Sequence, residues 1–254
     1  MILESFRLHG KNAVVTGASG GLGASMAVAL AEAGANVVVH GRNRDSTEKV
    51  CAAVQAAGVK AVPALSGLSQ GASCQELADL AVRELGSLDI LINNAGIIRR
   101  TPAVDVSNED WHEVIDVNLN AVFRLCQAAG RHMLARGSGK IINIASLLSF
   151  QGGVLVPAYA AAKGAVAQLT KALANEWAPR GINVNAIAPG YMETRATAAL
   201  QADPVRSRQI LDRIPAGRWG NPADLAGAAV FLASAGSDYM HGHVLVVDGG
   251  WLAR

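Results

Sequence analysis

The sequence has few cysteines, and none of them is spaced for metal or redox chemistry. Cys51, Cys74 and Cys126 are odd in number, and no two of them form a Cys-x-x-Cys pair. They fit a reducing compartment, so we expect a cytoplasmic protein without a metal site. His241 and His243 lie two residues apart. Without a third ligand nearby, a structural role is favoured for them over metal binding.

Charge of one sign and long apolar runs are also lacking. Only 17% of the 254 residues are charged and the net charge is +2, with the charges scattered, so there is no electrostatic footprint for nucleic acid. No apolar run reaches the length of a membrane span, and the start, MILESFRLHGK, lacks the apolar segment of a signal peptide. Neither nucleic acid nor a membrane is therefore an expected partner. The hydrophobic content of 51% predicts a globular protein with a well-buried core.

Apolar, strand-like runs alternate with helical patterns along the whole chain. This alternation predicts one α/β domain over residues 1–254, a doubly wound parallel sheet (Rossmann fold) with helices on both faces. Residues 191–221 are less regular and rich in Arg, Pro and Gly, which indicates a flexible lid over a site. Strands are expected at 11–16, 36–40, 59–65, 88–92, 140–146, 182–190 and 243–250, and helices at 24–33, 45–57, 74–85, 105–133, 159–177 and 222–233.

A glycine-rich turn, GASGGLG, follows the first expected strand and precedes a helix. This arrangement places backbone N–H groups and a helix N-terminus against a pyrophosphate. The spacing G-x-x-x-G-x-G of Gly17, Gly21 and Gly23 differs from G-x-G-x-x-G, but the glycines still permit a tight turn and close approach. The same residues spell the G-x-S-x-G elbow of hydrolases around Ser19. That alternative fails on position, because an elbow needs several strands before it.

Two further turns follow expected strands. The second strand ends at Gly41 and Arg42 without the acidic residue that favours NAD. Arg42 can clamp a 2′-phosphate, which slightly favours NADP; the alternatives are a solvated loop residue or stacking on adenine. Asn94 and Gly96 follow the fourth strand, where they form either a simple turn or part of a ligand crevice.

Ser146, Tyr159 and Lys163 carry the strongest indication of chemistry. Tyr159 and Lys163 are four residues apart on an expected helix and share one face, while Ser146 ends a buried strand. A free tyrosine has a pKa near 10, and a nearby ammonium lowers it, so the phenol can exchange a proton with an alcohol or a carbonyl. Ser146 would hold the reacting oxygen. Alone, a Tyr–Lys pair at this spacing is more often a pair of exposed side chains without a catalytic role.

Asn118 lies inside the segment expected to be mostly helical, residues 105–133. Asparagine is a poor residue for a helix interior, so it needs a reason. A side-chain hydrogen bond across a kink and a catalytic role are both open from the sequence.

These motifs, taken in order, resemble the short-chain dehydrogenase/reductase family: TGASGGLG, NNAG, Asn118, Ser146, Tyr159-AAA-Lys163 and Pro189-Gly190. The resemblance covers nearly the whole chain and implies a nicotinamide-dependent alcohol–carbonyl oxidoreductase. It implies that Tyr159 is the acid/base, that Lys163 lowers its pKa and holds the nicotinamide ribose, and that Asn118 positions a water. The implied cofactor contacts are Gly17, Ser19, Gly21, Leu22, Gly23, Arg42, Leu68, Asn94, Ala95, Gly96, Tyr159, Lys163, Pro189, Gly190, Met192 and Thr194.

Finer stretches such as NNAGIIRR and NEWAPRGINVNAIAPGYMET are similar to a branch of the family that acts on small sugar acids. The branch implies an anionic sugar-acid substrate and NAD, whereas Arg42 favours NADP. Gly67 stands where the family usually has an Asp that touches adenine. The branch also implies a homotetramer, in which the apolar end Trp251–Leu252 fits burial at an interface. The implied substrate contacts are Arg99, Arg100, Ser146, Gln151 and Tyr159.

Alternatives remain at several of these points. Arg99 and Arg100 would meet a carboxylate, or they form a solvent-facing pair at the start of the next segment. The same catalytic machinery would also serve a 3-oxoacyl thioester reductase. A non-catalytic dinucleotide-binding module is disfavoured, because it has no use for Asn118, Ser146, Tyr159 and Lys163 together.

Overall fold

The structure, a computed structural model, describes residues 1–68 and 71–254. The described residues form one parallel sheet of seven strands in the order β3-β2-β1-β4-β5-β6-β7. The predicted doubly wound sheet is confirmed, and the strand order reverses between β1 and β4, where such folds bind ligands. The strands are β1 (Asn12–Val15), β2 (Asn36–Gly41), β3 (Ala61–Leu65), β4 (Ile90–Asn93), β5 (Gly139–Ile144), β6 (Ile182–Pro189) and β7 (Val244–Val247).

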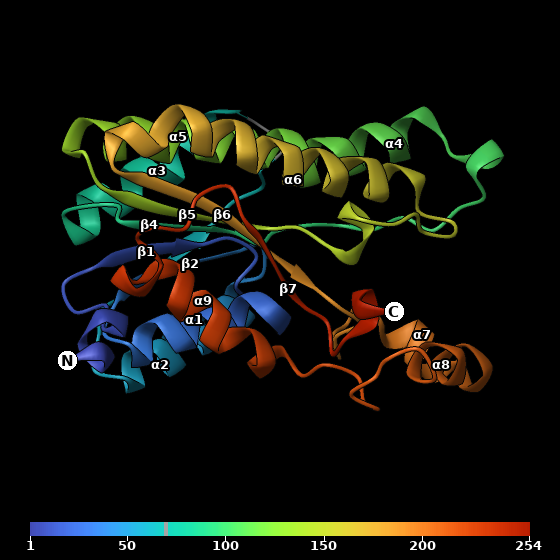
Figure 1. The fold of residues 1–254 in the computed structure, drawn as a ribbon. Helices are drawn as coiled ribbons and strands as arrows, with labels where there is room; N and C mark the ends of the chain where they lie inside the picture. The colour runs from blue at the N-terminus through green and yellow to red at the C-terminus, as the bar shows by residue number, and fades with distance from the viewer. Residues whose placement is uncertain (69–70) are drawn as a thin grey trace.

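Helices cover both faces of this sheet, as Figure 1 shows. One face carries α1 (Gly21–Glu32), α2 (Arg44–Ala56) and α9 (Ala226–Ala233). The other carries α3 (Gly71–Leu85), α5 (Ala121–Arg136) and α6 (Pro157–Trp177), with α4 (Asn108–Ile115) before α5. Two short helices, α7 (Ala198–Ala202) and α8 (Pro204–Leu211), lie beside the C-terminus, beyond the sheet. No helix in the described part of the chain is long and apolar enough to span a membrane.

The core consists of two layers because successive strand residues point to opposite faces of the sheet. Val14 and Leu91 pack with the residues of α3, α5 and α6, whereas their neighbours Val15 and Ile92 pack with those of α1, α2 and α9. All four side chains are almost fully buried. Burial on both faces explains why these strands are continuous apolar runs and not alternating ones.

The edge strand β3 contains a proline. Lys60 O accepts a hydrogen bond from Val37 N of β2, and Ser66 N donates to Gly41 O of the same strand. The N–H and C=O groups of successive residues point to opposite sides of a strand. The backbone groups of the even-numbered residues of β3 therefore face β2, and those of Pro63 point away from the sheet. Proline lacks an N–H, and an outward edge position is where a sheet tolerates it.

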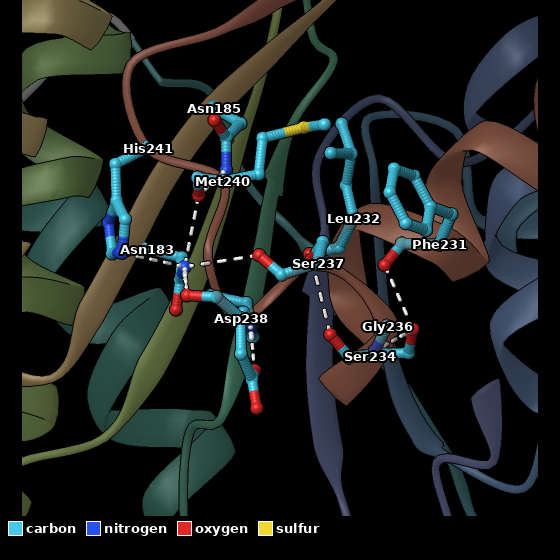
Figure 2. Close-up of polar contacts among 11 residues, drawn as sticks. Asn183, Asn185, Phe231, Leu232, Ser234, Gly236, Ser237, Asp238, Met240 and His241 are labelled. Carbon is cyan, nitrogen blue, oxygen red and sulfur yellow. Dashed lines mark hydrogen bonds and ion pairs between the residues drawn. The ribbon is translucent and has the colours of Figure 1, made fainter. Parts of the chain in front are cut away.

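A cluster of polar contacts fastens the beginning of β6 to the connection between α9 and β7 (Figure 2). The side-chain amide of Asn183, which is 6% exposed, lies within hydrogen-bonding distance of the carbonyl oxygens of Ser237 (3.3 Å), Asp238 (2.9 Å) and Met240 (3.0 Å). Asn185 also donates to the Met240 carbonyl at 2.8 Å. These bonds hold a connection that has little regular structure of its own.

The segment at 105–133 departs from a simple helix. It contains α4, a π-helical turn at Asp116–Asn120 and then α5. Ser107 caps α4 by accepting a hydrogen bond from Asp110 N at 3.0 Å, which explains why the helix begins there. The last expected helix begins as a 3₁₀ turn, Pro222–Leu225, before α9.

Candidate functional site

A cleft of about 1340 Å³ lies at the carboxyl ends of the strands. One wall is the glycine turn after β1, and another is formed by the end of β5 and the start of α6. The far end is closed by α8 and by Trp251. The cleft therefore joins the expected dinucleotide-binding turn to the expected catalytic residues.

The glycine turn has the geometry that a pyrophosphate needs. Gly17 has a φ of +63°, and a Cβ there would lie 2.8 Å from Ala95 Cα, so only glycine fits. No side chain of the described residues caps the N-terminus of α1, which leaves the N–H groups of its first turn facing the cleft. The residues present fit a bound dinucleotide.

His40, which the sequence analysis did not single out, supports this turn from below. Its buried ring accepts a hydrogen bond from Gly17 N at Nδ1 (3.2 Å) and donates one from Nε2 to Ser66 O (3.1 Å). Burial lowers the pKa of His40. The hydrogen bond to Ser66 opposes this by raising the pKa, and the positive charge of Arg42 lowers it further. The neutral imidazole thus joins the ends of β1, β2 and β3.

The NNAG turn packs against the glycine turn. Thr16 Oγ1 accepts hydrogen bonds from Asn94 N (3.0 Å) and Ala95 N (3.1 Å), and the Asn94 side chain donates to the carbonyls of Thr16 (2.9 Å) and Gly17 (3.1 Å). Asn94 therefore positions the glycine turn through its side chain.

Asn118 lies in the π-helical turn and is fully buried. Its amide donates to Ile97 O (2.9 Å) and Val114 O (2.8 Å), and its carbonyl accepts from Ile97 N (3.3 Å). A Cβ at Gly96 would lie 2.6 Å from Asn118 Oδ1. The structural reason considered from the sequence, a side-chain hydrogen bond at a break in the helix, is present. The catalytic role of Asn118 stays a prediction.

Ser146, Tyr159 and Lys163 meet at the junction of β5 and α6. Burial raises the pKa of Tyr159, while its hydrogen bond with Ser146 and the positive charge of Arg100 lower it. Lys163 Nζ lies 5.6 Å from the centre of the Tyr159 ring and donates to Ile144 O at 2.5 Å. Burial lowers the pKa of Lys163 to about 8. The phenol and the Ser146 hydroxyl can thus act on one oxygen in the cleft, with the ammonium beside the Tyr159 ring.

The two candidate substrate arginines, Arg99 and Arg100, lie in different surroundings. Arg100 lines the cleft and donates to Ala196 O at 3.0 Å. Arg99 lies outside it, where it pairs with Glu113 at 2.7 Å and with Asp110 at 3.4 Å. This places Arg99 in a surface ion-pair cluster on α4.

Most of the other expected cofactor residues line the cleft, and three lie behind its wall. Leu68 is buried among core residues below α3, and Gly23 and Ala95 pack next to the glycine turn. The expected cofactor and substrate residues that line the cleft are Gly17, Ser19, Gly21, Leu22, Arg42, Asn94, Gly96, Arg100, Ser146, Gln151, Tyr159, Lys163, Pro189, Gly190, Met192 and Thr194.

The far end of the cleft joins Gln151, an expected substrate contact, to residues that the sequence did not assign to the site, Tyr191, Arg213 and Trp251. Trp251 is 3% exposed and packs against the Tyr191 ring at 4.7 Å between centroids. Its indole N–H donates to Gln151 at 3.2 Å, and the Arg213 guanidinium lies 3.9 Å from its ring centre. No sequence motif links these residues, because they come from the loop after β5, the segment after α8 and the C-terminus.

The fold, glycine turn and Ser–Tyr–Lys arrangement define a dinucleotide-binding oxidoreductase architecture. A family model described as Enoyl-(Acyl carrier protein) reductase matches residues 17–252. The chain belongs to the short-chain dehydrogenase/reductase family.

Individual relatives are similar over their full length. The chain is 52% identical to a 2-dehydro-3-deoxy-D-gluconate 5-dehydrogenase of Escherichia coli (strain K12), over 100% of both chains. A solved protein of Agrobacterium tumefaciens with bound NADP, proposed to be a 2-deoxy-D-gluconate 3-dehydrogenase, is 54% identical with a TM-score of 0.90, covering 98% of this chain and 99% of that one. A gluconate 5-dehydrogenase of Burkholderia cenocepacia in complex with NADP and tartrate is 43% identical, with a TM-score of 0.96 and 100% coverage of both chains.

Proposed function

We propose that this protein transfers a hydride between a nicotinamide cofactor and a secondary alcohol or ketone of a small sugar acid. The observation that carries the proposal is the meeting of Ser146, Tyr159 and Lys163 in the wall of a cleft that begins at the glycine turn. Relatives with activity on 2-dehydro-3-deoxy-D-gluconate and gluconate support the substrate class. 2-Dehydro-3-deoxy-D-gluconate or 2-deoxy-D-gluconate is the first choice, and gluconate oxidised at carbon 5 is the alternative.

Tyr159 exchanges the proton with the reacting oxygen of the substrate. Ser146 donates to that oxygen and holds it beside the phenol. The positive charge of Arg100 favours the phenolate, and Lys163 places its ammonium beside the Tyr159 ring. When bound, the nicotinamide ring accepts or supplies the hydride.

The cofactor is held along the other half of the cleft. The N–H groups at the start of α1 and the turn at Gly17 receive the pyrophosphate. Exposed Arg42 at the end of β2 is placed for a 2′-phosphate, and two similar structures contain NADP. These points favour NADP over NAD.

Residues 191–221 act as the lid over the substrate, as part of a single domain. Their helices α7 and α8 and the residues between β6 and α7 line the outer half of the cleft. Ile210 and Ile214 pack against Trp251, so the lid rests on the C-terminal segment.

The assembly we infer is a homotetramer. Trp251 is already buried within its own chain, so it is not a free interface residue. Exposed Trp111 (38%) and Phe123 (45%) on α4 and α5 are better candidates for an interface. Light scattering of the purified protein tests the assembly, and a monomeric mass would contradict it.

The experiment that tests the function follows the absorbance of the reduced nicotinamide with purified protein. Each of NAD⁺ and NADP⁺ is paired with 2-deoxy-D-gluconate, 2-dehydro-3-deoxy-D-gluconate and gluconate. Turnover on a deoxy sugar acid, higher with NADP(H), is expected. Turnover on acyl thioesters, with none on the sugar acids, would select the thioester reductase instead.

A further inference from the structure

The indole of Trp251 lies between two polar side chains at the end of the cleft away from the glycine turn. Its N–H donates to Gln151 Oε1 at 3.2 Å, and the Arg213 guanidinium lies over the ring at 3.9 Å from its centre. An indole N–H is a donor and never an acceptor, so the Gln151 oxygen must face Trp251. The amide NH₂ of Gln151 is therefore left as a donor at the cleft that Gln151 lines.

Arg213 lines the same part of the cleft, and its charge is not neutralised there. Within residues 1–68 and 71–254 it has no ion pair with an acidic side chain. Asp212, its neighbour in the sequence, and Asp248, close to Trp251 in the sequence, are engaged elsewhere. Asp212 accepts from Arg208 at 2.9 Å, and Asp248 accepts from Gly250 N and Leu252 N, each at 2.8 Å.

We propose that Arg213 and Gln151, both held by Trp251, form the binding site for the carboxylate of the substrate. The proposal rests on the sugar-acid function proposed above. A planar guanidinium offers paired donors that match two carboxylate oxygens, and the Gln151 amide adds a further donor. Arg99 is paired with Glu113 outside the cleft, and Arg100 donates to Ala196 O and acts on Tyr159, so Arg213 is the better placed of the three for the carboxylate.

Trp251 is the positioning residue of this site. It is buried against Leu147, Ile210 and Ile214, so the loop after β5 and the segment carrying Arg213 are fixed on one rigid ring. Stacking on an indole also restricts the guanidinium before the substrate arrives, which lowers the entropy cost of binding. The reacting hydroxyl then lies at Tyr159 while the charged end of the substrate lies at Arg213.

The test compares Arg213→Gln with Arg208→Gln. Arg208 is on α8, pairs with Asp212, and has a side chain 78% exposed outside the cleft, so it is a matched control. Arg213→Gln removes a hydrogen bond between charged groups. We therefore expect the KM for the sugar acid to rise by about ten- to hundredfold. Arg208→Gln should keep the wild-type KM, and Arg213→Lys should fall between them. Both glutamine variants should retain the wild-type affinity for cofactor, measured by fluorescence titration.

Two further readouts separate the carboxylate site from a structural effect. The uncharged amide of the same sugar acid should show no difference between wild type and Arg213→Gln. Trp251→Phe keeps an aromatic ring but releases the Gln151 oxygen, so KM should rise with little change in cofactor affinity. An equal loss with the acid and its amide, or an unchanged KM in Arg213→Gln, would overturn the proposal.

Calorimetry measures the binding of the sugar acid to the enzyme with reduced cofactor. This measurement, together with turnover, tests the proposed function and the proposed carboxylate site separately. Turnover by wild type with an unchanged KM in Arg213→Gln rejects the carboxylate site and keeps the function. Binding without turnover, weakened in Arg213→Gln, rejects the function and keeps the site. Binding that is absent in wild type, or equal in wild type and variant, rejects the site.

Discussion

At the scale of single residues, burial and nearby positive charge have opposite effects on the pKa of Tyr159. Burial raises the pKa of its phenol, and the hydrogen bond with Ser146 and the charge of Arg100 lower it. Lys163 loses part of its affinity for a proton through burial, which lowers its pKa to about 8. The sequence predicted that Lys163 lowers the pKa of Tyr159, whereas here burial raises that pKa and the groups that oppose the rise are Ser146 and Arg100.

Replacing the phenol tests its role directly. Tyr159→Phe removes the proton-exchanging hydroxyl and keeps the ring, so we expect kcat to fall by about 10²–10⁴-fold. Cofactor affinity should stay near that of wild type. Steady-state turnover and fluorescence titration measure the two quantities. Retained turnover would show that another group exchanges the proton.

His40 predicts a dependence of stability on pH. Burial lowers its pKa from 6.5, so below that pH the unfolded chain binds a proton that the folded chain resists. The contribution of neutral His40 to stability is thus present above pH 6.5 and is lost as the pH falls toward the folded pKa. Urea denaturation from pH 8 to pH 5 should show a smaller fall in His40→Gln than in wild type.

The matched control for this experiment is His112→Gln, which changes an exposed histidine on α4. Its pH profile should follow that of wild type. Because Gly17 N donates to His40 Nδ1, protonation of the ring also removes an acceptor beneath the glycine turn. If His40→Gln and wild type lose stability equally on acidification, the neutral ring is not the source.

At the scale of elements, the buried amide of Asn183 makes more hydrogen bonds to the connection between α9 and β7 than that of Asn185 (Figure 2). Asn183→Ala leaves three carbonyl oxygens without that donor, so we expect a loss of about 1–3 kcal/mol in the free energy of unfolding. Asn183 lies near the start of β6 and the cleft lies at the other end of this strand, so turnover should not change. Asn108→Ala, at the exposed start of α4, should alter stability by much less, as measured by urea denaturation.

Sequence patterns predicted the strands and the long helices, because both are set by local apolar runs, but they did not predict the short helices α7 and α8. The π-helical turn at Asp116–Asn120 could not be placed in this way, since Asn118 is held by Ile97 from another element. The ends of α1, α3 and α6 extend beyond the expected ranges by a few residues at their N-termini, where the apolar pattern is weak.

At the scale of the whole molecule, motif order indicated the glycine turn and the Ser146–Tyr159–Lys163 group. The far end of the cleft was not predictable, because Arg213 and Trp251 meet only after the C-terminus folds back onto α8. Arg99 and Arg100 are adjacent in sequence, yet one joins an ion pair on α4 and the other lines the cleft. Such a difference depends on tertiary packing and leaves no local signal.

The proline in β3 predicts how the molecule behaves when concentrated or heated. Pro63→Val restores an outward N–H on an edge strand, so we expect faster aggregation on heating, measured by light scattering. Ala61 also has its backbone groups on the outer side of β3. Ala61→Val therefore adds apolar surface at a comparable position without adding a backbone donor. It should aggregate less than Pro63→Val, and equal rates would assign the effect to hydrophobicity alone.

The two edges of the sheet are therefore unequal. The edge at β3 is interrupted by Pro63, whereas β7 carries the sequence VLVV with a complete set of backbone donors. Two copies that paired symmetrically through β7 would leave a proline-bearing strand at each outer side. Such a sheet would end at its dimer and offer no template for fibre growth.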